Sequence, residues 1–196
     1  MKKQILLLAI MMGVLGTSMA QKIKVESGDL SFLKDASEVS ITFEYPENMK
    51  YGKMTQQEYI DKKVKEKEDK KEGSGEKWKD DFFADREQHY EPQFIESFDK
   101  YTGDLYVVQD DEDLKYTMNV KTTFMEPGFQ FGFQSKNAAI DLEITFFETA
   151  SPDNILAKVK ISKAPGAAHP DQGMRVADAY FTAAQKFGKE LKKKYL

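Results

Sequence analysis

The sequence predicts an α+β fold, a two-layer sandwich in which a mostly antiparallel, mixed sheet of about five strands is covered by a C-terminal helix. Three observations predict it. Apolar and polar residues alternate over short segments between residues 114 and 161, residues 55–101 are rich in helix formers, and residues 172–195 carry an apolar stripe at helical spacing.

The first strand is expected over residues 39–45, where every second residue is apolar and Pro46 ends the pattern. Residues 52–101 then form a helical insertion. Its Lys/Glu run at 62–71 is typical of a solvated helix face, with a partner-binding surface as the alternative. Gly73 and Gly75 separate this helix from a second one, and Pro92 ends or kinks the second and opens a third.

A short apolar run at 105–108 is consistent with a buried strand. Four alternating segments follow, at residues 114–124, 129–133, 140–146 and 155–161, and short turns join them. They predict an antiparallel meander with one solvated face. We expect Phe129, Phe131 and Phe133 to face the core, or alternatively to line an apolar ligand pocket. The last helix, with its stripe from Val176 to Tyr195, is expected to cover the apolar face of this sheet.

Residues 1–20 have the pattern of a signal peptide. Lys2 and Lys3 precede an apolar run at 5–15, and Ser18-Met19-Ala20 places small residues where a signal peptidase reads, so cleavage is expected after Ala20. The run is about half the roughly 20 residues needed to cross a bilayer. Residues 21–196 are thus expected to be one exported domain, periplasmic or extracellular, and the absence of cysteine excludes a lipid anchor on that residue.

Composition argues against several functions. The net charge is -4, and removal of residues 1–20 makes it more negative, so a nucleic-acid partner is not expected. There is no Gly-rich phosphate-binding motif, and the acidic residues 110–113 lack the spacing of an EF-hand. His89 and His169 stand alone without a neighbouring ligand at metal spacing. We therefore expect neither a metal nor another cofactor.

The second predicted helix carries the residues that we interpret as an interaction surface: Trp78, Asp81, Asp85, Arg86 and Glu87. Arg86 is expected to lie over the aromatic stripe of this helix. An alternative interpretation is a carbohydrate-active hydrolase that uses Asp81, Asp85 or Glu87, since glycosidases use paired carboxylates.

Several segments resemble known proteins. Residues 27–33, Phe43-Glu44-Tyr45, residues 78–86 and residues 90–94 resemble uncharacterised secreted proteins of Bacteroidetes. The C-terminal third, with its alternating strands, glycine-containing loop and helix from Gly173 to Leu191, is more loosely similar to envelope domains of the TolB N-terminal and CsgG type. This resemblance implies a mixed sheet packed with helices and a role in protein assembly at the outer membrane without catalysis. It assigns no functional residue.

The sequence thus predicts a noncatalytic exported protein, an interaction or assembly domain of the periplasm or cell envelope with a protein partner. A carrier of a small apolar or lipidic ligand and the hydrolase remain as alternatives.

Overall fold

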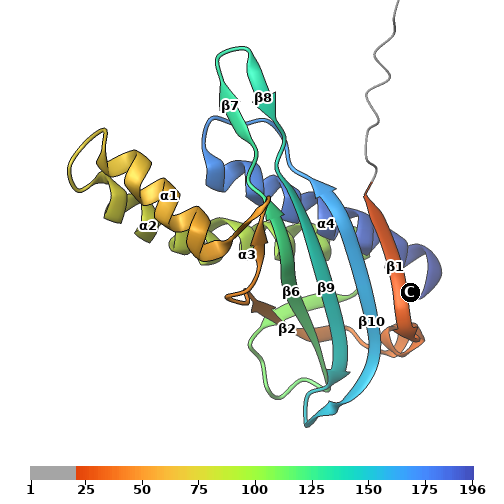
Figure 1. Ribbon diagram of the computed structural model, residues 1–196. Helices are drawn as coiled ribbons and strands as arrows, with labels where there is room; N and C mark the ends of the chain where they lie inside the picture. The colour runs from red at the N-terminus through yellow and green to blue at the C-terminus, as the bar shows by residue number, and fades with distance from the viewer. Residues whose placement is uncertain (1–20) are drawn as a thin grey trace, which may run out of the picture.

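The computed structural model describes residues 21–196 and confirms the α+β class (Figure 1). The expected sheet of about five strands is wrong. Within the described residues an eight-stranded mixed sheet has the order β1-β10-β9-β6-β2-β5, with β3 and β4 attached beside β6, and β7 and β8 form a separate two-stranded sheet. The predicted signal peptide at 1–20 lies outside the described residues.

The elements have the following bounds. The strands are β1 (Lys22–Gly28), β2 (Glu38–Glu44), β3 (Lys50–Tyr51), β4 (Met54–Thr55), β5 (Tyr106–Gln109), β6 (Tyr116–Glu126), β7 (Phe129–Phe131), β8 (Gln134–Lys136), β9 (Ala139–Glu148) and β10 (Ser151–Pro165). The helices are α1 (Gln56–Glu68), α2 (Ser74–Asp85), α3 (Glu91–Thr102) and α4 (Gln172–Lys194), with a 3-10 turn η1 (Ser31–Asp35) and a π-helical turn η2 (Arg86–Tyr90).

The additional strands have weak sequence signals for physical reasons. β1 lies at the sheet edge, antiparallel to β10, and it has only two partly buried apolar side chains, Ile23 and Val25. β3 and β4 have two residues each, which is too short for any periodicity. β2 pairs in parallel with both β5 and β6. The helical segment returns the chain for β5, and the segment 110–115, which contains no helix, joins β5 to β6.

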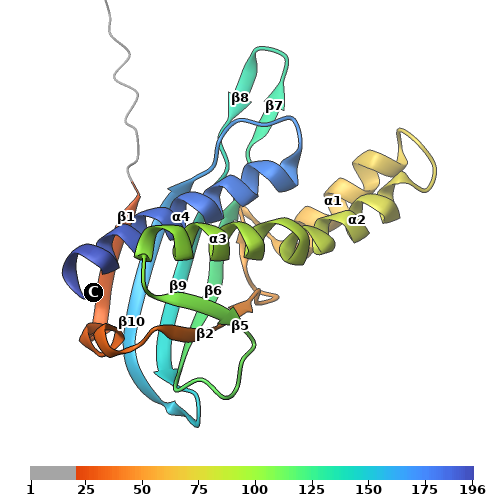
Figure 2. The same cartoon turned by 180° about the vertical axis from the view of Figure 1, so that it is seen from behind.

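The core lies between the sheet and a layer formed by α3 and α4, which run side by side across one face (Figure 2). Ile144, Val159 and Phe187 are among the side chains from these elements with at most 1% exposure. The opposite face is polar: Lys121 forms an ion pair with Glu44, and the Asn119 side-chain amide donates to Thr42 Oγ1. The prediction that the last helix covers the apolar face is confirmed.

The predicted insertion divides into two parts. α3 belongs to the core layer: Ser97 Oγ donates to the Phe181 carbonyl at 2.9 Å, and Gly188 lets α4 approach the α3 backbone. α1 and α2 instead form a helical pair that extends beyond the sheet (Figure 1). Thr55 and Glu58 form a capping box at the start of α1, which fixes where the pair leaves the sheet.

The expectation for the Phe129 strand is also wrong. β7 and β8 form a hairpin that projects from one end of the sheet (Figures 1 and 2). Phe131 pairs with Gln134, so the turn is Gly132-Phe133 and each strand has only three residues. The helical layer does not cover strands at this position, and Phe129, Phe131 and Phe133 are 47%, 82% and 110% exposed.

Candidate functional site

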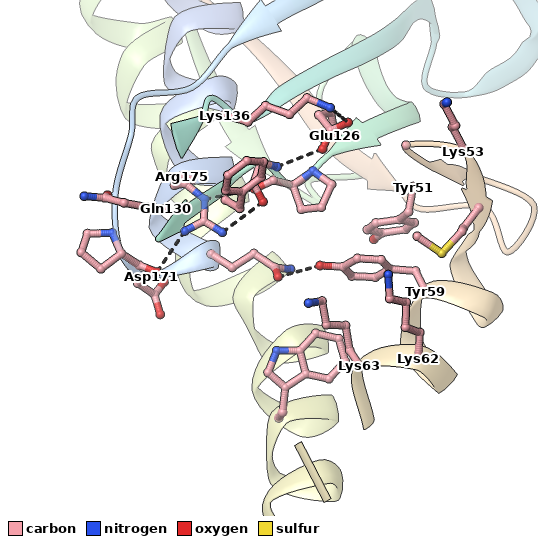
Figure 3. Close-up of a pocket in the computed structure, with 18 of the residues that line it drawn as sticks. Tyr51, Lys53, Tyr59, Lys62, Lys63, Glu126, Gln130, Lys136, Asp171 and Arg175 are labelled. Atoms are coloured by element: carbon pink, nitrogen blue, oxygen red, sulfur yellow. Dashed lines mark hydrogen bonds and ion pairs between the residues drawn. The ribbon is translucent and has the colours of Figure 1, made fainter. Parts of the chain in front are cut away.

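A cleft of about 850 Å³ lies between α1, the base of the β7–β8 hairpin and the first turn of α4 (Figure 3). Six cationic side chains line it: Lys53, Lys62, Lys63, Lys67, Lys136 and Arg175. Only two acidic residues, Glu126 and Asp171, line it as well. We call this the basic cleft. It concentrates positive charge in a chain whose net charge is -4.

The ion pairs of the cleft neutralise only part of this charge. Lys136 pairs with Glu126, while Lys62 and Lys63 share Glu66 at 3.8 and 2.9 Å. Across residues 21–196 the ammonium groups of Lys53 and Lys67 form no ion pair.

Arg175 is 5% exposed, and its guanidinium is bonded to backbone carbonyls. Nε donates to Pro127 O at 3.1 Å, Nη1 donates to His169 O and to Pro170 O, and Nη2 donates to Gly128 O at 3.4 Å. No carboxylate of the described chain pairs with it. Arg175 therefore joins the hairpin base to the loop before α4 and contributes an uncompensated charge to the cleft.

Aromatic rings form part of the cleft wall. Tyr51 stacks on Tyr59 with ring centres 5.1 Å apart, and the Tyr59 hydroxyl donates to Gln172 Oε1 at 2.7 Å. Trp78 is partly buried, and its ring centre lies 5.1 Å from that of Phe82. Burial raises the pKa of Tyr51 to about 12, and burial raises the pKa of Tyr59 as well, so both phenols are neutral at physiological pH.

A second cleft of about 460 Å³ adjoins the first, and Trp78 and Lys67 line both. Asp81, Asp85 and His89 are among its polar groups, with His89 Nδ1 2.9 Å from Asp85 Oδ1. Burial raises the pKa of Asp85, while the hydrogen bond and charge of His89 oppose the shift. A Cβ at Gly173 would lie 2.5 Å from the Asp85 carboxylate, so this carboxylate packs directly on the first turn of α4.

The predicted interaction surface does not form one surface. Trp78, Asp81 and Asp85 line the second cleft, but Glu87 lines a separate hollow with Glu91 and Gln109. The Arg86 guanidinium lies 4.9 Å from the ring centre of Phe83, a residue of the aromatic stripe over which it was expected to lie. It also lies 4.5 Å from the ring centre of Tyr45, and its Nη2 donates to Gln56 Oε1. Arg86 thus stabilises the junction of α2 with the sheet.

Sequence reasoning missed the cleft cations. Lys62, Lys63 and Lys67 belong to the run interpreted as a solvated face, and no periodicity distinguishes them from Lys65 or Lys70. Arg175 had a usable signal, because it occupies the apolar stripe of the last helix four residues before Ala179. The hairpin had one too: residues 127–135 contain no charged side chain.

Among residues 21–196 there is no group of three or more His, Asp or Glu side chains arranged to hold a metal ion. None of the helices in the described part of the chain is both long enough and apolar enough to cross a membrane.

No protein-family model and no curated protein matches the chain. Among solved structures, the chain is similar to the PelC dodecamer from Paraburkholderia phytofirmans, with a TM-score of 0.40, 6% identity, and coverage of 85% of this chain and 96% of that chain. A substituted form of the same dodecamer gives a TM-score of 0.42, 7% identity, and coverage of 85% and 95%. Likeness at this level carries no argument about function.

Proposed function

We propose that the protein is a noncatalytic, exported interaction domain that docks onto a partner protein through its β7–β8 hairpin. The observation that carries the proposal is the exposure of Phe129, Phe131 and Phe133 on this projecting hairpin. The signal peptide expected at residues 1–20 supports export to the periplasm or beyond.

The hairpin has the properties of a docking element. Burial of one exposed phenylalanine stabilises a complex by roughly 1.5–3 kcal/mol before the costs of association. No charged side chain between Glu126 and Lys136 would have to be desolvated. A cluster of exposed aromatics of this kind is typical of an interaction site and is costly to leave in water.

The base of the hairpin is held in place. Arg175 donates hydrogen bonds to the carbonyls of Pro127 and Gly128. Glu126, the last residue of β6, forms an ion pair with Lys136, the last residue of β8. A fixed base reduces the entropy lost on binding. Phe129 and Phe131 are two residues apart on one face of β7, while Phe133 lies in the turn, so the complementary surface is an uncharged apolar groove of the partner.

The alternatives have less support. Asp81 and Asp85 line the same cleft, but Asp85 is hydrogen-bonded to His89 and packed on Gly173. Glu87 lines a separate hollow, so the three residues do not supply two unengaged carboxylates facing one cleft, as a glycosidase requires. A carrier of an apolar ligand requires an apolar cavity, whereas the 850 Å³ cleft is lined by six cations.

Site-specific crosslinking in the producing cells tests the proposal. A photoreactive phenylalanine analogue at Phe131 is expected to form an adduct with one envelope protein. The same analogue at Ile155 is not, because Ile155 is 45% exposed but pairs with Phe147 near the end of β9, whereas the hairpin precedes the start of β9. The purified partner should then bind the parent protein and lose at least tenfold in affinity for the double variant Phe131→Ser, Phe133→Ser, because two anchors are removed.

Three results would contradict the proposal: equal crosslinking from both positions, adducts only between copies of this chain, or binding of the hairpin to protein-free vesicles with no protein adduct.

A further inference from the structure

We propose that the basic cleft is a binding site for an organic anion, with a phosphate or carboxylate group held by its lysines and an apolar or ring portion packed against Trp78 and Phe129. This site goes beyond the proposed docking function, and Phe129 at the hairpin base is the one phenylalanine that both proposals use.

The first argument is the convergence of charge. Lys53 comes from the β3–β4 turn, Lys62, Lys63 and Lys67 come from α1, and Lys136 comes from β8, yet all line one hollow (Figure 3). Lys62 and Lys63 share one carboxylate, and neither Lys53 nor Lys67 has an acidic partner in the described chain. Like charges collected from separate segments raise the free energy of the empty cleft, and a bound anion relieves this repulsion.

The second argument is the buried guanidinium. Arg175 lines the cleft at 5% exposure, and only carbonyl dipoles compensate its charge. A guanidinium has five N–H groups, and the four bonds to Pro127, Gly128, His169 and Pro170 leave one unused. A charge this far from water is weakly screened, so it attracts an anion in the cleft more strongly than a surface lysine does.

The third argument is the wall. Trp78 is partly exposed beside Lys67, and Phe129 is 47% exposed at the hairpin base. Rings of this kind pack against sugar faces, aromatic rings and acyl chains. The cleft therefore favours an anion that carries such a portion over a bare inorganic ion.

Trp78 makes the test direct, because it is the single tryptophan of the sequence and lines the cleft. The protein is titrated with a hexose phosphate, a hexuronate and a neutral hexose, and separately with vesicles of phosphatidylglycerol or of phosphatidylcholine, while tryptophan emission is recorded. We expect a saturable change with at least one anionic probe, none with the neutral hexose or phosphatidylcholine, and weaker binding at higher salt. A response to the soluble anions identifies a free ligand, and a response to phosphatidylglycerol alone identifies a lipid headgroup.

Matched variants locate the site. The double variant Lys53→Gln, Lys67→Gln should weaken anion binding about tenfold, since two charge-assisted contacts are lost. The control Lys65→Gln, Lys70→Gln removes the same charge from exposed positions outside the cleft and should bind like the parent. Circular dichroism confirms that both variants are folded.

The inference is overturned if no anionic probe changes the emission, or if both variants weaken binding equally. The outcome is separable from the docking proposal, because Phe131 and Phe133 do not line the cleft and the Phe131→Ser, Phe133→Ser variant should keep its anion affinity.

Discussion

Phe187 joins three elements of the core, and its truncation tests the layered packing. The side chain is 1% exposed near the middle of α4. Its ring centre lies 6.0 Å from that of Phe98 on α3 and 6.4 Å from that of Phe146 on β9. The Phe187→Ala variant therefore leaves a cavity where the helical layer meets the sheet.

The expected cost follows from this burial. A fully buried phenylalanine replaced by alanine loses about 3–5 kcal/mol of unfolding free energy, from lost transfer free energy and the residual cavity. Domains have total stabilities of roughly 5–15 kcal/mol, so the variant should be strongly destabilised but in many conditions still folded. Phe187→Leu should cost clearly less, because most of the volume is retained.

The measurement is a urea titration in which unfolding is monitored by circular dichroism and by the emission of Trp78, which reports on the α1–α2 region. Lys186→Ala changes the exposed preceding residue of α4 and is expected to shift the unfolding free energy by less than about 0.5 kcal/mol. If Phe187→Ala lowers the free energy of unfolding by less than about 1 kcal/mol, while its circular dichroism change on unfolding matches that of the parent, the packing of α4 between α3 and the sheet is refuted.

Three further predictions concern Gly173, Asp85 and Thr55. Gly173→Ala should cost about 1–3 kcal/mol because its Cβ would meet the Asp85 carboxylate, and thermal melts should show that Asp85→Ala in the same molecule restores part of the loss. Burial raises the pKa of Asp85, so its contribution to stability is present below its ordinary pKa of about 4 and is lost as the pH rises through the higher folded value. Asp85→Asn should therefore gain stability relative to the parent as the pH rises above about 4 in urea titrations, and a difference that stays constant with pH would contradict the raised pKa. Thr55→Ala removes the capping box shared with Glu58 and should cost about 1 kcal/mol in the same assay, while Thr145→Ala, on the polar face of the sheet, serves as a comparison without a cap.

Much of the fold could be predicted where one face of an element is buried. The sequence carries a clear hydrophobic period in four elements, because each has one face on the core and one face in solvent: β6, β9, β10 and α4. β1, β3 and β4 could not be predicted in this way, because an edge strand with two partly buried residues and strands of two residues leave no period to detect.

The hairpin shows the limit of the same method. Phe129, Phe131 and Phe133 alternate as well as any core strand, and alternation alone does not reveal which side of a strand is covered. The chain leaves the sheet at Gly128, where φ is positive and a side chain would collide with the Lys136 carbonyl. The Gly132-Phe133 turn follows only four residues after Gly128, so β7 and β8 have three residues each.

The sequence by itself determined the α+β class, the order of the main elements and the apolar stripe of α4, because these are properties of neighbouring residues and their spacing. Only the tertiary structure decided that lysines from α1, the β3–β4 turn and β8 meet Arg175 in one cleft. The physical reason is that surface charges are constrained by partners far away in the chain, and local sequence carries no record of which partners the fold brings near.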